Sequence, residues 1–155
     1  MTNKQKRLLP AILLWLAIIW IMSAQTGDIS ARNSSIFERE LFALFAGVPK
    51  LKQFLEQVLV VVPIRKVMHF LEYAVLAVLV SGFLKEDKHQ LFRDSAAKCT
   101  LCFCTAAAAL DELHQFYVPG RNGNPADVLL DIVGAFSGIL IYRGMIVILS
   151  LRRKQ

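Results

Sequence analysis

The chain has 155 residues, of which 55% are hydrophobic, and its mean hydropathy is +0.49. This composition excludes an ordinary soluble domain and favours a small membrane protein that forms one domain over residues 1–155. The net charge is +6, and in a membrane protein such an excess usually reflects topology and contact with anionic lipid. The sequence contains no nucleic-acid-binding motif, so we do not expect a nucleic-acid partner.

Apolar segments recur along the chain between charged or turn-forming stretches. A helix needs about 20 predominantly apolar residues to span a bilayer. Four segments approach this length, at residues 8–24, 67–84, 96–116 and 126–149. The first follows basic residues and resembles a signal peptide, but its apolar run is long and its cleavage site is weak, which favours a retained helix. The expected fold is an all-α integral membrane bundle of four transmembrane helices.

The stretch between the first two spans carries an amphipathic pattern over residues 41–62. Its apolar residues recur at helical spacing, with Lys, Gln and Glu on the opposite face. The pattern is broken near Gly47–Pro49 and stops at Pro63. We predict an amphipathic helical segment outside the cytoplasm. The pattern leaves open whether this segment lies along the membrane interface, caps the bundle or re-enters the membrane.

Basic residues near the ends of the spans predict the orientation. They cluster at the N-terminus, between the second and third spans and at the C-terminus, whereas the loop between the third and fourth spans contains only Arg121. The positive-inside rule therefore predicts that both termini are cytoplasmic. The loop over residues 25–66 argues against this orientation, because it also carries several basic residues.

Polar side chains gather near the outer ends of the predicted spans. They are Lys66, His69, Glu72 and Tyr73 in the second span, Asp111, Glu112, His114 and Gln115 in the third, and Asp127 and Asp131 in the fourth. A charge inside the membrane costs roughly 2.5–3.5 kcal/mol on insertion scales, so such residues need a partner or a function. Helical spacing puts each group on a shared face at a similar depth. The sequence therefore predicts an acid-rich pocket in the outer leaflet.

With the exception of His114, these residues form the predicted binding set together with Arg121. Because the carboxylates outnumber the nearby bases, some of them hold protons, bind a cation or face elsewhere. A histidine–carboxylate cluster also suits acid–base chemistry, and its candidate catalytic residues are His69, Glu72, Asp111 and Glu112. Internal ion pairing is the structural alternative. The spacing matches no standard zinc motif, so neither a metal nor another cofactor is predicted.

Several features have simpler explanations. Lys66 can snorkel to lipid head groups, Tyr73 can be an interfacial aromatic residue, and Arg121 can pair with Asp127 or with an anionic head group. The pattern from Gly134 to Gly138 is typical of close helix packing. The cysteines, Cys99, Cys102 and Cys104, are interpreted as small buried helix residues and not as a metal or redox pair.

The polar residues resemble the VanZ-like family of bacterial membrane proteins. The matching pieces are residues 23–25 with Ser30 and Ser34, residues 65–73, and residues 111–116 with Arg121, Asp127, Asp131 and Gly134. The resemblance implies a four- or five-helix protein of the bacterial cytoplasmic membrane. The named member of the family is associated with low-level resistance to the glycopeptide teicoplanin. The resemblance implies no reaction and hence no catalytic roles.

The leading hypothesis is an envelope protein that binds membrane lipids, a lipid-linked envelope intermediate or a lipoglycopeptide at the outer leaflet. Lys66 and Arg121 would hold phosphate, and the carboxylates with His69 would recognise hydroxyls or amines. The alternative is a membrane hydrolase or transferase in which His69 is the base and Gln115 and Arg121 stabilise developing charge. A proton- or cation-coupled transporter is less favoured because the inner halves of the spans are apolar.

Overall fold

The computed structural model describes residues 1–86, 89, 91 and 94–152, and this part of the chain contains helices and no strand. The helices are α1 (Asn3–Ser23), α2 (Gly27–Leu44), α3 (Pro49–Val61), α4 (Ile64–Lys85), α6 (Ala96–Gln115) and α7 (Pro125–Arg152). The all-α prediction is confirmed. Part of the charge used to predict the topology, on Lys88, Arg93, Arg153 and Lys154, lies outside the described residues.

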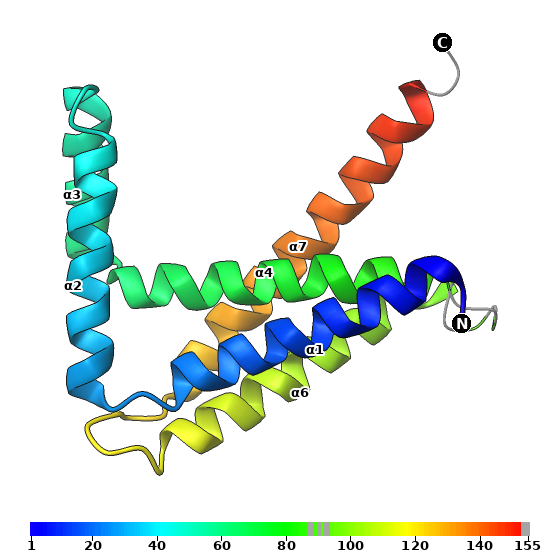
Figure 1. Cartoon of the computed structure of the whole chain (residues 1–155), viewed down its shortest axis with the longest axis horizontal. Coiled ribbons are helices and arrows are strands. Elements are labelled where there is room, and N and C mark those ends of the chain that lie inside the picture. The colour runs from blue at the N-terminus through cyan, green and yellow to red at the C-terminus, as the bar shows by residue number, and fades with distance from the viewer. Residues whose placement is uncertain (87–88, 90, 92–93, 153–155) are drawn as a thin grey trace.

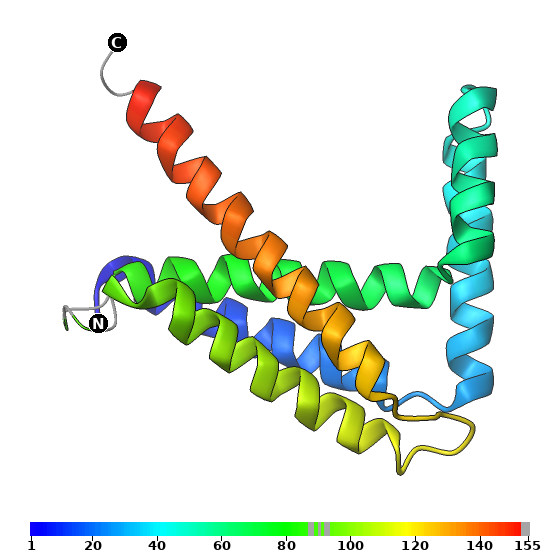
Figure 2. The ribbon, with the colours of Figure 1, turned by 180° about the vertical axis from the view of Figure 1, so that it is seen from behind.

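Helices α1, α4, α6 and α7 alternate in direction and form a bundle (Figure 1). Both termini lie on the side away from the α2–α3 hairpin, and the C-terminal part of α7 stands away from the other helices (Figures 1 and 2). The core joins apolar side chains of all four helices, namely Ile12, Ile19, Tyr73, Leu76, Ala77, Val80, Cys104, Ala108, Ala135 and Ile139. Cys104 is buried there, whereas Cys102 is exposed, so the interpretation of the cysteines as buried residues was wrong for Cys102.

The prediction of four apolar spans requires a correction. Within the described residues, three helices are long and apolar enough to cross a membrane, namely α1, α4 and α7. Helix α6 is long enough, but Lys98, Asp111 and Glu112 fall within it and reduce its apolar character. These three apolar helices fit a multi-pass membrane protein. Helix α6 returns the chain along the bundle, so α4 and α7 run in the same direction (Figure 2).

The closest packing in the bundle is between α4 and α7, which cross in both views (Figures 1 and 2). A Cβ atom added at Gly134 would collide with the carbonyl oxygen of Phe70, and one added at Gly138 would collide with that of Ala74. The two glycines and the two contacted residues are each four positions apart, so one turn of each helix lies against one turn of the other. The predicted role of Gly134 and Gly138 in close packing is confirmed.

The amphipathic segment forms a helical hairpin that begins earlier than predicted. Helix α2 starts at Gly27, well before residue 41, and the break predicted near residues 47–49 separates it from α3. Pro49 occupies the first turn of α3, where its missing N–H is tolerated, and Pro63 directly precedes α4. The chain therefore reverses at residues 45–48 and turns again into α4.

The α2–α3 hairpin runs across the direction of α4 and leaves much of its surface uncovered (Figure 1). No residue of α3 is buried, and Val60 and Val61 are 85% and 79% exposed. Helices that lie in a membrane interface present apolar residues on one face and charged residues on the other. With α4 crossing the bilayer, a hairpin in this direction follows the membrane surface, which favours the interfacial arrangement over re-entry.

Substitution of Gly138 by Ala tests the α4–α7 contact. We expect Gly138→Ala to lower the free energy of unfolding by about 1–3 kcal/mol, because the new methyl group overpacks the contact with Ala74. Gly144→Ala is the matched control, since no atom lies within 4 Å of a Cβ placed there. Denaturation in detergent micelles measures both variants, and equal stability of the two would contradict the close contact.

Single tryptophans on α3 test the interfacial position of the hairpin. Phe54 and Glu56 are both exposed and lie on nearly opposite sides of the helix. We expect Phe54→Trp, in a background without other tryptophans, to show blue-shifted emission that brominated lipids quench. Glu56→Trp is expected to be quenched much less. Equal quenching of both positions would place the hairpin either wholly inside or wholly outside the bilayer.

Candidate functional site

Carboxylates from α4, α6 and α7 converge at the end of the bundle beside the hairpin. Asp111 and Asp131 are 1% and 0% exposed, and Glu72 and Glu112 are also buried. Asp131 lies close enough to the other three to interact with them electrostatically. The predicted convergence of these residues is therefore present in the structure, and we call the four residues the carboxylate cluster.

Hydrogen bonds satisfy only part of the carboxylate cluster. Gln115 Nε2 donates to Asp111 Oδ2 at 2.9 Å, and the backbone N–H of Asn124 donates to Glu112 Oε2 at 2.9 Å. Among the described residues, Asp111 Oδ1 and both carboxyl oxygens of Asp131 have no hydrogen-bond partner. A buried polar atom without a partner costs about 1–3 kcal/mol, and more when it is charged. The cluster thus retains capacity for a hydrogen-bond donor or a positive charge.

The two basic residues of the predicted binding set, Lys66 and Arg121, have partners other than those predicted. Lys66 Nζ lies 2.8 Å from Asp127 Oδ1, which makes Lys66 an internal ion-pair partner at the start of α7. Arg121 does not pair with Asp127. Its Nε donates to the carbonyl oxygen of Gln25 at 3.2 Å, and its Nη2 donates to the carbonyl oxygens of Met22 at 3.1 Å and Ser23 at 3.4 Å.

Arg121 therefore caps the C-terminal end of α1. The last carbonyls of a helix lack partners within the helix and carry partial negative charge, so a guanidinium is a suitable donor for them. Arg121 is buried, and burial lowers the pKa of its guanidinium, an effect reinforced by the positive charge of Arg65. An arginine nonetheless stays protonated in proteins, so it brings a fixed positive charge beside the carboxylate cluster.

A close backbone approach completes the link between α2 and the loop that precedes α7. The N–H of Gly27 donates to the carbonyl oxygen of Pro119 at 3.0 Å. A Cβ atom at Gly27 would collide with the backbone of Gly120, which itself has a φ of 71°. Only glycine adopts such a φ without a steric penalty. The start of α2 is thereby attached to the loop that carries Arg121.

A polar pocket of about 290 Å³ lies between the end of α1, α2, the start of α4 and Arg121. Its polar lining consists of Gln25, Ser30, Asn33, Ser34, Glu40, Arg65, His69, Glu72 and Arg121. Apolar atoms, including those of Met22, Phe37 and Met68, make up most of the surface inside the pocket. Donors, acceptors and charges of both signs thus surround one opening next to the carboxylate cluster.

The structure distributes the predicted site residues over several places. His69, Glu72 and Arg121 line the polar pocket. Tyr73 and Asp111 line a separate apolar groove between α1 and α6. The remaining predicted residues line neither of these sites, namely Lys66, Glu112, Gln115, Asp127 and Asp131. All of them except Asp131 make a hydrogen bond or an ion pair near the sites.

Helix α2 was not predicted to contribute side chains to the site, although Ser30 and Ser34 were part of the family resemblance. Ser30, Asn33 and Ser34 are spaced i, i+3 and i+4, so one face of α2 presents them together. Asn33 Nδ2 donates to Gln25 Oε1 at 2.9 Å, which ties this face to the end of α1. The same helical spacing in the sequence is the signal that could have found them.

His69 and Glu72 form the one pair in the polar pocket with the composition of an acid–base dyad among the described residues. The Nδ1 atom of His69 and the Oε2 atom of Glu72 are 3.5 Å apart, a distance longer than that of a well-formed hydrogen bond. Trp15 Nε1 donates to the carbonyl oxygen of Glu72 at 2.9 Å and holds this part of α4 against α1. Within the described residues, no group of three or more His, Cys, Asp or Glu side chains is placed to hold a metal ion.

The family comparison covers most of the chain. Residues 8–149 match the family model described as VanZ/LLP1. No curated protein and no solved structure matched the chain significantly. The matched region includes the polar pocket and the carboxylate cluster.

Substitution of Arg121 tests its capping role. We expect Arg121→Ala to lower the free energy of unfolding by about 2–4 kcal/mol, because carbonyl oxygens of α1 lose charged donors in a buried place. Hydrogen exchange should accelerate at residues 20–27, where α1 ends. Arg39→Ala is the control, since Arg39 is exposed and its ion pair with Glu40 contributes little. Unchanged exchange at the end of α1 would contradict the role.

Proposed function

Because the chain belongs to the VanZ/LLP1 family and has a polar pocket at the end of a membrane bundle, we propose that it binds the head group of a lipid-linked envelope component. The observation that carries the proposal is the mixed lining of this pocket, with hydroxyls, amides, two carboxylates and two guanidiniums around one opening. Such a set suits a phosphorylated or glycosylated head group, which needs both donors and acceptors.

The size of the polar pocket limits what it holds. A volume of about 290 Å³ lies at the lower end of the roughly 300–1,000 Å³ typical of small-molecule sites. It accommodates a phosphate with one adjoining polar group and not a whole amphiphile. The apolar side chains of Ile36, Phe37 and Met68 at the same pocket support contact with the start of a lipid chain.

Arg65 is the proposed phosphate ligand in this pocket. It is half-buried, lines the pocket and has no ion-pair partner among the described residues. Arg121 adds positive charge nearby but already donates to backbone carbonyls. A guanidinium without a partner is suited to a bidentate contact with phosphate oxygens. The assignment moves the phosphate contact from Lys66, which is paired with Asp127, to Arg65.

The membrane position of the pocket follows from the proposed orientation. The pocket and the α2–α3 hairpin lie at the end of the bundle opposite both termini. We propose that α6 crosses the membrane with α1, α4 and α7, that the termini are cytoplasmic and that this end faces the outer leaflet. Occupancy of the pocket would then change how lipidated glycopeptides such as teicoplanin reach the envelope.

The His69–Glu72 pair favours a second candidate function, which is turnover of the bound lipid. A histidine next to a carboxylate can act as a general base when the carboxylate orients the ring. The apo distance of 3.5 Å does not exclude this role, since catalytic contacts often shorten when substrate binds. If the protein turns the lipid over, mass spectrometry of the lipid that copurifies with it would detect a modified lipid. His69→Gln would abolish the modification.

Lipid mass spectrometry of purified variants tests the proposed binding. We expect Arg65→Gln to reduce the retained lipid-linked phosphate about tenfold, because one charge-assisted contact of about 1.4 kcal/mol is lost. Ser34→Phe should exclude the same lipid by filling the pocket. Arg32→Gln is the control, since Arg32 is exposed on α2 and does not line the pocket.

Two results would contradict the proposal. One is an unchanged lipid profile in both Arg65→Gln and Ser34→Phe, and the other is an equal loss in Arg32→Gln. In cells, any change in teicoplanin susceptibility that the wild-type protein produces should disappear in the two pocket variants and persist in Arg32→Gln. Western blotting of membranes establishes that all variants are present in equal amounts.

A further inference from the structure

Helices α1 and α6 run side by side but pack loosely, and an apolar groove separates them. Two hollows of about 520 and 440 Å³ make up this α1–α6 groove, and both are lined by Leu16 and Phe103. The other wall residues are almost all apolar, for example Leu9, Leu13, Ala106 and Leu110. The two hollows therefore adjoin at Leu16 and Phe103 and follow one another along the bundle.

The dimensions of the α1–α6 groove match one lipid chain. On α1 the lining runs from Leu9 to Ile21, and on α6 it runs from Cys99 to Asp111. At a rise of about 1.5 Å per residue, each wall is roughly 18 Å long. This is slightly more than half of the hydrocarbon core, which is about 30 Å thick. A chain from one leaflet therefore extends along the whole groove.

The end of the groove nearest the hairpin is polar. Asp111 lies there together with Tyr73 and Trp20, and it is the one carboxylate in the lining. Asp111 is 1% exposed, and its Oδ1 atom has no hydrogen-bond partner among the described residues. Trp20 stacks on His114 with ring centroids 4.4 Å apart, which joins α1 to α6 at this end. An apolar groove thus ends at an unsatisfied buried acceptor.

The charge around Asp111 favours a cationic ligand. Asp111 interacts electrostatically with Glu72 and Asp131, which are also acidic. Arg121 also interacts electrostatically with Asp111, but it donates to the end of α1, while Lys66 pairs with Asp127 and Arg65 lines the polar pocket. An ammonium group would supply both the missing positive charge and N–H donors.

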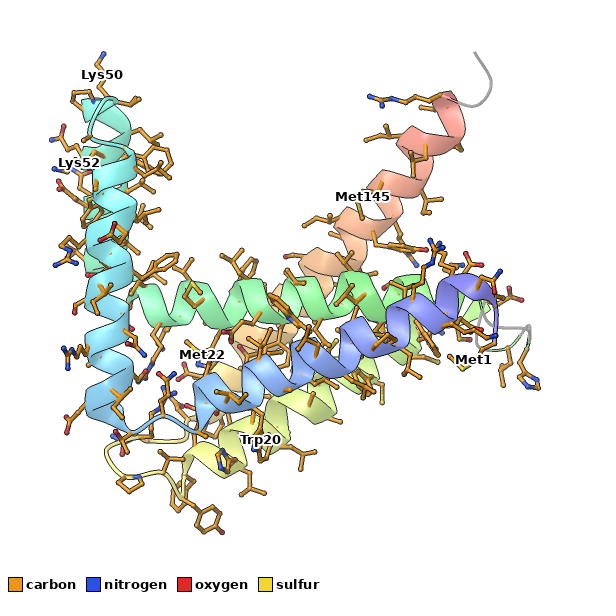
Figure 3. All side chains as sticks on the ribbon, viewed as in Figure 1. Met1, Trp20, Met22, Lys50, Lys52 and Met145 are labelled. Carbon is orange, nitrogen blue, oxygen red and sulfur yellow. The ribbon has the colours of Figure 1, made fainter. Side chains whose placement is uncertain are left out.

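We propose that the α1–α6 groove binds one hydrocarbon chain of a bilayer lipid whose head group carries a primary ammonium, with Asp111 as the acceptor. This site is distinct from the polar pocket, because the two share no lining residue. Figure 3 shows Met22, which lines the polar pocket, and Trp20, which lines the groove, on opposite sides of α1.

Photo-crosslinking in nanodiscs tests the proposal. The probes are phosphatidylethanolamine, phosphatidylcholine and phosphatidylglycerol that carry the same diazirine-labelled chain. We expect phosphatidylethanolamine to label peptides of α1 and α6 about tenfold more than phosphatidylcholine, which corresponds to about 1.4 kcal/mol. Phosphatidylcholine lacks N–H donors, and phosphatidylglycerol offers hydroxyls without the positive charge, so both should label weakly.

Variants separate recognition of the chain from recognition of the head group. Ala106→Trp should block the groove and remove the label from α1 and α6, whereas Ala109→Trp is the control because Ala109 is exposed on α6 outside the groove. Asp111→Asn keeps the shape of the side chain and should reduce the preference for phosphatidylethanolamine to parity. Arg65→Gln should leave the preference intact.

Three results would overturn the proposal. The first is equal labelling by the three probes in the wild-type protein, and the second is labelling of α1 and α6 that persists in Ala106→Trp. The third is cross-linking of α1 or α6 to a second copy in place of lipid. Because Arg65 lines only the polar pocket, failure of the lipid-linked head-group proposal would leave these outcomes unaffected.

Discussion

The close contact between α4 and α7 is the constraint on which the rest of the structure depends. Gly134 and Gly138 bring the backbone of α7 against the carbonyls of Phe70 and Ala74. Asp131 lies one turn before Gly134 on the same face, so the contact that joins the helices also buries this carboxylate beside Glu72. In an apolar surrounding, helix association relies on close packing because lipid tails are as apolar as leucine. Small residues therefore determine where the charged ones lie.

At the end of the bundle beside the hairpin, contacts to backbone groups hold the structure together as much as contacts between side chains do. Arg121 donates to carbonyls at the end of α1, Glu112 accepts from the backbone of Asn124, and Gly27 donates to Pro119. These contacts attach the loop between α6 and α7 to the ends of α1 and the start of α2. Three residues that the sequence offers as ligands, Glu112, Lys66 and Arg121, thus act mainly in organising the fold. Their removal would change both ligand sites indirectly.

Two sites of different chemistry lie on opposite sides of α1 (Figure 3). The polar pocket combines donors and acceptors and has an available guanidinium at Arg65, whereas the groove is apolar and ends at the acidic side chain of Asp111. The carboxylate cluster lies between the two sites and contributes a carboxylate to the lining of each. The cluster has a surplus of hydrogen-bond acceptors. Burial of such a surplus is costly unless donors or cations meet it. In the proposed arrangement, bound ligands would contribute to satisfying these buried acceptors.

The sequence by itself determined the all-α class, the positions of the long helices, the close-packing role of Gly134 and Gly138 and the convergence of the carboxylates at one end of the bundle. Each of these follows from local periodicity, because a helix of fixed rise and pitch assigns every residue a depth and a face. Helix α6 was predicted as a span despite the charged residues within it, and residues 27–40 were not recognised as helix. Only the tertiary structure decided which partner each polar group meets: Lys66 with Asp127, Arg121 with the end of α1, and Asp111 with the α1–α6 groove. Such pairings depend on the rotation and separation of whole helices, and helical periodicity carries no information about either.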